Sequence, residues 1–276
     1  MSSDPNAKSR RFPLPLDKLG AGAAPKVREV LMPQRHLREA AADAARQQSP
    51  RGLGMDSDSV RRRMVQRLQQ EGLNDERVLQ ALATVPRHEF VDSALAIQAY
   101  EDTSLPIGHG QTISKPSVVG RMIAMLFGGA TARQTGQLGK VLEIGTGCGY
   151  QAAVLALLAR QVVSIERLKP LHDKARLNLG AVRAASVRLI YGDGRLGHPP
   201  AAPFDSIIAA AGGEDIPPAW LAQLAPGGRL VAPTVAPGGR GQLLVVVDHQ
   251  VEAGASRFVR TEHEAVLFVP LKSGVM

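Results

Sequence analysis

The chain has 276 residues, of which 44% are apolar, so it is long enough for one large α/β domain with a substantial core. The formal net charge is +8, but only 4% of the residues are aromatic and no dense Lys/Arg run is interleaved with them, which argues against a nucleic-acid partner. A single cysteine excludes an internal disulfide framework, and no apolar run approaches the roughly 20 residues that span a bilayer, so we expect a cytoplasmic monomer without a membrane partner.

The first 58 residues differ in composition from the rest of the chain. Residues 1–58 are rich in Pro, Ala, Arg and Gln, and their prolines interrupt any long periodicity. We therefore predict a flexible basic extension over 1–58 and a folded domain over 59–276.

A small helical subdomain is expected at the start of the folded domain, over residues 59–104. The spacing of Val60, Met64 and Leu68 is typical of the buried face of a helix. Asn74 is the expected N-cap of the next helix.

The next segment, residues 105–116, contains several glycines and polar residues and is too rich in turn formers for a strand interior. A helix is expected from Ser117 to about Phe127. Ser114 and Ser117 both stand near the start of this helix, where either hydroxyl could cap it. Taken alone, the segment favours a capping role for Ser114 over a catalytic one.

The central motif of the chain is VLEIGTGCGYQ, residues 141–151: an apolar strand, a glycine turn and the start of an Ala/Leu-rich helix. Glycine lacks a Cβ, so Gly145, Gly147 and Gly149 can take positive φ and let a ligand lie against the bare backbone. A strand, a glycine turn and a helix N-terminus form the nucleotide-facing corner of an open α/β sheet.

The residues around this turn indicate which nucleotide it holds. In a dinucleotide fingerprint the third glycine comes three positions after the second, whereas Gly149 comes two positions after Gly147. Glu143 could accept from an ammonium group, directly or through water, but would repel a phosphate. The next strand ends in Glu166, from which a carboxylate reaches ribose hydroxyls. Although glycines occur in many such turns, the two carboxylates favour S-adenosylmethionine, which has an adenosine, a cation and no phosphate.

The sequence beyond Glu166 continues the alternation of strands and helices. A third strand, over 186–191, runs into Gly192, Asp193 and Gly194, where Asp193 could accept from an adenine amino group or merely brace a turn. Further helices are expected over 151–159, 170–179 and 216–224, and further strands over 203–211 and 226–233.

The end of the chain departs from a simple doubly wound sheet. Residues 242–248 and 265–269 have strand propensity, and no helix of useful length separates them, so we expect an antiparallel pair. The predicted fold is therefore α/β: a Rossmann-like methyltransferase sheet over 138–276, mostly parallel with a C-terminal antiparallel hairpin, preceded by the small helical subdomain.

From about residue 60 to residue 271 the chain resembles the protein-L-isoaspartate O-methyltransferases, which repair aged proteins. The resemblance rests on VPRHEFVD (85–92), LPIGHGQTIS (105–114), the glycine turn, GDG (192–194) with PFD (203–205), and VLFVPL (266–271). The glycine turn is shared by many methyltransferases, whereas QTIS (111–114) is the diagnostic part. In the family its serine, here Ser114, is assigned to the active site. Cys148 stands where relatives more often have Ser.

The resemblance implies a reaction in which the free α-carboxylate of an L-isoaspartyl residue takes the methyl group of S-adenosylmethionine. This carboxylate has an ordinary pKa of about 3.5 to 4, so it is ionised at neutral pH and no general base is required. Alignment then carries the catalysis, and effective molarity can supply up to roughly 7 to 11 kcal/mol in ideal cases. We predict that Ser114 donates a hydrogen bond that orients the carboxylate.

The expected cofactor-binding residues come from the same motifs, and no metal ligand is expected. They are Gln111, Thr112, Ile113, Glu143, Gly145, Thr146, Gly147, Glu166, Asp193 and Gly194. His109 has no proton to transfer in this chemistry, so we expect it to serve loop packing. Cys148 lacks a base and an orienting group nearby, so we interpret it as a turn residue rather than a nucleophile.

Two alternatives stay open at this level. One is an S-adenosylmethionine methyltransferase that acts on a small molecule or on RNA, which the basic charge supports slightly and the QTIS segment opposes. The other, from a different class, is a nucleotide-binding dehydrogenase or a non-catalytic binding module. Methyl transfer from S-adenosylmethionine distinguishes these classes.

Overall fold

The computed structural model describes residues 58–252 and 254–276. The chain divides into two units, Met1–Pro50 and Arg51–Met276, and the described residues belong to the second. The predicted extension lies outside the described residues apart from Asp58, which begins helix α2, so its flexibility and its boundary stay predictions.

A seven-stranded sheet with the order β5-β4-β3-β6-β7-β8-β9 forms the centre of the fold. The first five strands in this order, β5, β4, β3, β6 and β7, run parallel, and β8 and β9 add an antiparallel pair at one edge. The predicted fold class is therefore confirmed. The strand bounds are β3 Lys140–Ile144, β4 Gln161–Glu166, β5 Val187–Tyr191, β6 Phe204–Ala209, β7 Leu224–Val235, β8 Gln242–Glu252 and β9 Ala255–Val266.

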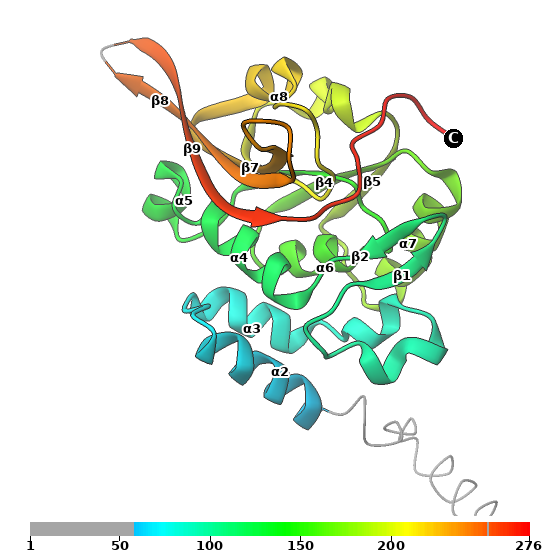
Figure 1. Ribbon diagram of the computed structural model, residues 1–276. Coiled ribbons are helices and arrows are strands. Elements are labelled where there is room, and N and C mark those ends of the chain that lie inside the picture. The colour runs from blue at the N-terminus through cyan, green and yellow to red at the C-terminus, as the bar shows by residue number, and fades with distance from the viewer. Residues whose placement is uncertain (1–57, 253) are drawn as a thin grey trace, which may run out of the picture. The chain divides into compact units, whose positions relative to one another are not determined.

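The central strands β3, β4 and β6 are buried on both faces. Successive residues of a strand point to opposite faces, so each of these strands contributes to two cores. Val141 belongs to one hydrophobic cluster, which the main helices complete, and the adjacent Leu142 belongs to the other, which contains Trp220. Figure 1 shows the two layers: α8 lies on one side of the sheet, and α4 and α6 lie on the other, with α2 and α3 beyond them.

The helices lie close to where the apolar spacing of the sequence predicts them, with one difference in an N-cap. The N-terminal helical subdomain is present, but the side chain of Asp75, not Asn74, caps α3 by accepting from the backbone N–H groups of Arg77 and Val78. The α-helices are α2 Asp58–Gln70, α3 Glu76–Thr84, α4 Pro116–Leu126, α5 Ala130–Thr135, α6 Tyr150–Ala156, α7 Lys169–Ala181 and α8 Pro218–Gln223. The 3-10 helices are η2 Arg87–Phe90, η3 Ser93–Gln98, η4 Gly194–Leu196 and η5 Pro199–Ala201.

Two sequence predictions about strands are wrong. The segment 105–116 is not irregular: β1 (Leu105–Gly108) and β2 (Gln111–Ile113) form a short antiparallel hairpin. The last strand of the sheet covers Ala255–Val266 rather than 265–269. Its whole length pairs with β8, and Phe268 and Val269 follow it as an extended segment.

None of the helices within the described ranges has both the length and the apolar character that crossing a membrane requires.

Candidate functional site

A cavity of about 330 Å³ opens at the carboxyl ends of the parallel strands. β3 pairs with β4 on one side and β6 on the other, so the chain reverses its direction of winding there. Such a switch point leaves a crevice in which α/β sheets bind their ligands. The cavity volume falls in the ordinary range for small-molecule sites, about 300 to 1,000 Å³.

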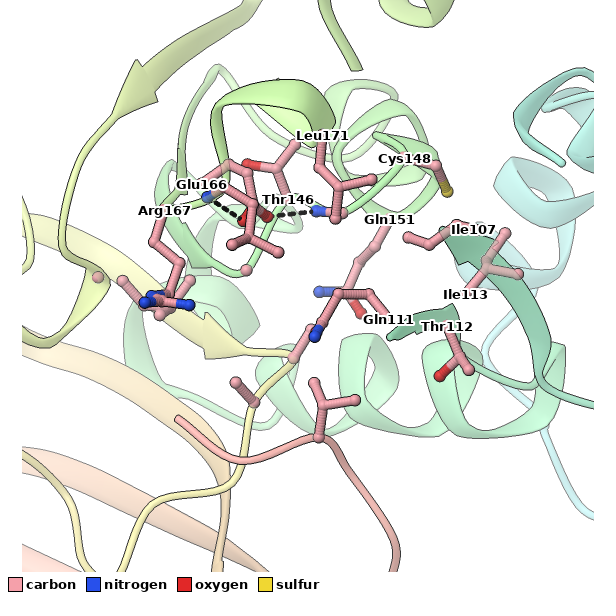
Figure 2. A pocket seen from close by; sticks show the side chains of 18 of the residues that line it. Ile107, Gln111, Thr112, Ile113, Thr146, Cys148, Gln151, Glu166, Arg167 and Leu171 are labelled. Atoms are coloured by element: carbon pink, nitrogen blue, oxygen red, sulfur yellow. Dashed lines mark hydrogen bonds between the residues drawn. The ribbon is translucent and has the colours of Figure 1, made fainter. Parts of the chain in front are cut away.

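Most of the predicted site residues lie together in the wall of this cavity, and Figure 2 shows several of them. The residues from the active-site segment, the glycine turn and the strand ends that line it are Gln111, Thr112, Ile113, Ser114, Gly145, Thr146, Gly147, Glu166 and Gly194. Glu143 and Asp193 are not part of the wall.

The glycine turn has the backbone geometry that the sequence predicts. Gly145, Gly147 and Gly149 have φ values of 88°, 56° and 94°, which L side chains rarely adopt. A Cβ at position 147 would also come within 3.1 Å of Ile107 Cδ1 from the β1–β2 hairpin. The turn can therefore present bare backbone to a ligand on its cavity side.

Glu166 braces this turn from the end of β4. Its Oε2 accepts from Gly147 N at 2.9 Å and its Oε1 from Leu168 N at 2.9 Å, as the dashed lines in Figure 2 show. The residue is buried but lines the cavity. Because a carboxylate offers about four lone-pair sites, two remain for hydroxyl donors in the cavity.

Glu143 is not part of the cavity wall and is linked to the turn through Ser164 and Thr146. It is fully buried, and Oε2 accepts a short hydrogen bond from Ser164 Oγ, which is also 2.5 Å from Thr146 Oγ1. Among the described residues its Oε1 has no hydrogen-bond partner, and the same is true of Gln151 Nε2 in the cavity wall. Burial raises the pKa of Glu143 to about 8, although the hydrogen bond from Ser164 opposes the rise.

Asp193 and Gly194 have different roles although they are adjacent. Gly194 lines the cavity, and its carbonyl accepts from Trp220 Nε1 at 2.8 Å. The carboxylate of Asp193 accepts from Arg195 N at 2.9 Å and from Gly274 N at 2.6 Å. Of the two roles considered for Asp193, the geometry favours bracing a turn, because Asp193 binds backbone donors and, unlike Glu166, is not part of the cavity wall.

The hydroxyl of Ser114 lines the cavity and makes no hydrogen bond to any described residue. Asp102, not Ser114, binds the N-terminus of α4: its carboxylate accepts from Ser117 N at 2.9 Å and from Ser117 Oγ at 2.7 Å. The N-cap position itself is Lys115, which makes no side-chain cap bond. The capping interpretation of Ser114 therefore loses its support, and its hydroxyl is available to a ligand.

His109, which we expected to serve loop packing, and Cys148, which we interpreted as a turn residue, also line the cavity. His109 is exposed at the tip of the β1–β2 hairpin and has a φ of 54°, between Gly108 and Gly110, which have positive φ as well. Cys148 is buried in the turn, and burial raises the pKa of its thiol, so it is a poor nucleophile.

Behind the cavity wall, Arg87 supports the turn from the helical subdomain. Its side chain is buried, Nε donates to Ala99 O at 2.8 Å, and the guanidinium carbon lies 4.8 Å from the ring centroid of Tyr150. Phe90 packs edge-on against the same ring. Tyr150 is therefore held between two residues of the VPRHEFVD motif, which explains how that motif contributes to the site.

Sequence reasoning missed part of the cavity wall. Gln151 points toward the same part of the cavity as Gln111 in Figure 2, and it lies in the quoted motif, so its position after the turn could have identified it. Further members come from segments that only the fold brings together. They include Ile107 of β1, Arg167, Leu168 and Leu171 after β4, Ala210 and Ala211 after β6, and Val269, Pro270, Leu271, Lys272 and Met276 near the end of the chain.

Known proteins resemble this chain in sequence and in fold. The family model of protein-L-isoaspartate(D-aspartate) O-methyltransferase (PCMT) matches residues 59–276. A Methylibium petroleiphilum protein-L-isoaspartate O-methyltransferase is 59% identical over 268 residues, which cover 96% of each chain, so the similarity continues into the residues before Ser59. A Burkholderia lata protein of the same name is 56% identical over 224 residues, or 81% of this chain and 69% of the relative.

Solved structures show the same fold. One protein-L-isoaspartate O-methyltransferase structure has a TM-score of 0.67 and 26% identity, and covers 78% of this chain and 67% of its own. A Plasmodium falciparum structure, described as a complex with S-adenosyl-L-homocysteine, has a TM-score of 0.65 and 20% identity, and covers 77% of this chain and 98% of its own. The resemblance that the sequence predicts is confirmed: the chain belongs to the protein-L-isoaspartate(D-aspartate) O-methyltransferase family.

Proposed function

We propose that the cavity binds S-adenosylmethionine and that the protein transfers its methyl group to the free α-carboxylate of L-isoaspartyl residues in proteins and peptides. Membership of the family supports this activity. The observation that carries the assignment to this site is that Ser114, with a free hydroxyl, and Glu166, with free lone pairs, line one and the same cavity.

The cofactor end of the proposed site consists of the glycine turn and Glu166. The cavity fits the group, because the turn offers bare backbone and Glu166 keeps acceptor sites for the two ribose hydroxyls. Thr146 and Gly194 complete this wall. Glu143 acts indirectly, through Ser164 and Thr146, and Asp193 holds the loop that presents Gly194.

The acceptor end consists of the β1–β2 hairpin and Ser114. We assign to Ser114 Oγ the hydrogen bond that orients the isoaspartyl carboxylate, and to Gln111, Thr112 and Ile113 the wall that separates it from water. The bound cofactor supplies an electrophilic methyl group on a sulfonium. Transfer of this methyl group to a carboxylate oxygen would leave the electron pair of the broken carbon–sulfur bond on sulfur and would move no proton. The protein therefore needs to align and desolvate the carboxylate, without a base.

A direct assay tests the activity. Methyl incorporation from S-adenosylmethionine is measured with an isoaspartyl peptide, with the same peptide containing ordinary aspartate, and with RNA. We expect label in the isoaspartyl peptide alone. Equal labelling of the two peptides, or labelling of RNA only, would exclude the proposed substrate.

We also propose that the protein works as a monomer in the cytoplasm. The one cysteine of the sequence is buried and forms no disulfide, as suits a reducing compartment. Light scattering at micromolar concentration tests the first statement, and fractionation of cells tests the second.

A further inference from the structure

The segment that follows the last strand runs over the cavity beside the ends of β4 and β5. In Figure 1 it is the red segment that leaves β9 and ends at the mark C. Leu271, Lys272 and Met276 all line the cavity, although none belongs to a helix or a longer strand. We call residues 272–276 the strap.

Backbone hydrogen bonds attach the strap to the loop after β4. Met276 N donates to Arg167 O at 2.8 Å, and Lys169 N donates to Met276 O at 2.8 Å. The guanidinium of Arg167 adds a clamp, since its Nε donates to Gly274 O at 2.9 Å and its Nη2 to Ser273 O at 3.4 Å. On the other side, Gly274 N donates to Asp193 Oδ2 at 2.6 Å.

The anchors of the strap identify which end of the cavity it covers. Arg167 follows Glu166 directly, and Asp193 directly precedes Gly194, which lines the cavity. Glu166 and Gly194 are the residues at the proposed ribose and adenine positions. The strap therefore lies at the proposed adenosine end of the cavity.

Burial contributes little to the attachment of the strap. Val275 is 50% exposed and Met276 is 71% exposed, so few apolar contacts resist its release. Segments held mainly by exposed hydrogen bonds open at a small fraction of the free energy of global unfolding. The strap can therefore open without disturbing the sheet beneath it.

We infer that the strap is a further part of the cofactor site: it closes over the adenosine end, with Met276 and Lys272 toward the cofactor, and it opens to exchange S-adenosylhomocysteine for S-adenosylmethionine. This inference rests on the proposed function, because it requires the cofactor in this cavity. It assigns Arg167 as a positioning residue that holds the strap rather than as a group that reacts.

The test measures binding and release of S-adenosylhomocysteine by stopped-flow fluorescence of Trp220, the one tryptophan of the chain, whose ring N–H is bonded to Gly194 of the cavity wall. Two variants open the strap: deletion of residues 273–276, and Arg167→Met, which keeps the side-chain stem and loses the clamp. Arg176→Met is the matched control, because Arg176 is an exposed arginine on α7 that pairs only loosely with Asp173, at 3.8 Å.

Arg167→Met loses the two hydrogen bonds of the clamp, and the deletion loses all five that attach the strap. Both variants should therefore release S-adenosylhomocysteine about tenfold faster or more, with the KM for peptide unchanged at saturating cofactor. The control should match the parent. Release rates within about twofold of the parent in both variants would overturn the inference; if the deletion variant does not fold, Arg167→Met decides. If the unaltered protein binds no S-adenosylhomocysteine, the proposed function itself fails.

Discussion

Two serines three residues apart provide a sharp test of the site. Ser114 lines the cavity with a free hydroxyl, whereas Ser117 is buried and bonded through both N and Oγ to Asp102. If Ser114 orients the substrate and Ser117 only stabilises the fold, alanine at 114 removes a contact to the substrate and alanine at 117 removes a contact within the fold. The same chemical change should therefore affect activity at one position and stability at the other.

The magnitudes follow from the partners. Ser117→Ala removes a 2.7 Å hydrogen bond to a carboxylate, which is expected to reduce the free energy of unfolding by about 1 to 2 kcal/mol, since Asp102 keeps its bond to Ser117 N. For a chain of this size that lowers Tm by roughly 2 to 6 °C. Ser114→Ala should change stability by less than about 0.5 kcal/mol but reduce kcat/KM by about 10- to 100-fold, the equivalent of one hydrogen bond to a charged group.

The assay combines thermal unfolding of both variants with initial rates of methyl transfer to an isoaspartyl peptide. We expect Ser114→Ala to melt with the parent and to turn over slowly, and Ser117→Ala to show the opposite. If Ser114→Ala keeps kcat/KM within about twofold of the parent, or melts lower than Ser117→Ala, the orienting role of Ser114 is wrong.

Three further predictions concern other parts of the site and its support. Burial raises the pKa of Glu143 to about 8, so the folded protein keeps a proton that the unfolded chain loses near its ordinary pKa of about 4.3, and the free energy of unfolding should fall from about pH 5 to pH 8. Glu143→Gln should reduce this fall by a few kcal/mol, as measured by urea unfolding. An unchanged dependence on pH would contradict the prediction. Glu166→Ala should weaken S-adenosylmethionine binding by about 1 to 3 kcal/mol in calorimetry, and unchanged affinity would refute the ribose role. Asp75→Ala should destabilise the protein by about 1 kcal/mol in the same urea experiment, whereas Asn74→Ala, its matched control, should change stability by less than about 0.5 kcal/mol; the reverse order would restore Asn74 as the cap.

The local features of the site were predictable because the local sequence determines them. Only glycine takes the φ values found at Gly145, Gly147 and Gly149 without strain. Glu166 ends an apolar segment that is typical of a strand buried inside a parallel sheet. Both signals need only the residues themselves and their spacing.

Strand predictions failed where the apolar pattern is weak. β9 is an edge strand with almost every residue exposed, so it has no alternation of apolar and polar residues to mark it. In the β1–β2 hairpin, Leu105 and Ile107 are buried and alternate with Pro106, but the strands are so short that the turn formers between them dominate the sequence. The interpretation of segment 105–116 as irregular followed from those turn formers.

Contacts between distant residues account for the rest of the site. Nothing near Asp193 in the sequence indicates that Gly274, 81 positions later, occupies its carboxylate. Likewise, Ser114 and Ser117 are equally good caps by position, and only the approach of Asp102 from the preceding loop decides between them. Glu143 has the expected residue type two positions before the turn, but its contact with Ser164 depends on the pairing of β3 with β4.

The most direct measurement of the central claim is the chemical position of the methyl group after one turnover. An isoaspartyl peptide is mixed with excess enzyme and deuterated-methyl S-adenosylmethionine, quenched in acid before the ester can cyclise, and sequenced by tandem mass spectrometry. The account predicts a methyl ester on the α-carboxylate of the isoaspartyl residue and on no other group. Label on another carboxylate or on a nitrogen, or an unlabelled peptide with saturated enzyme, would contradict it.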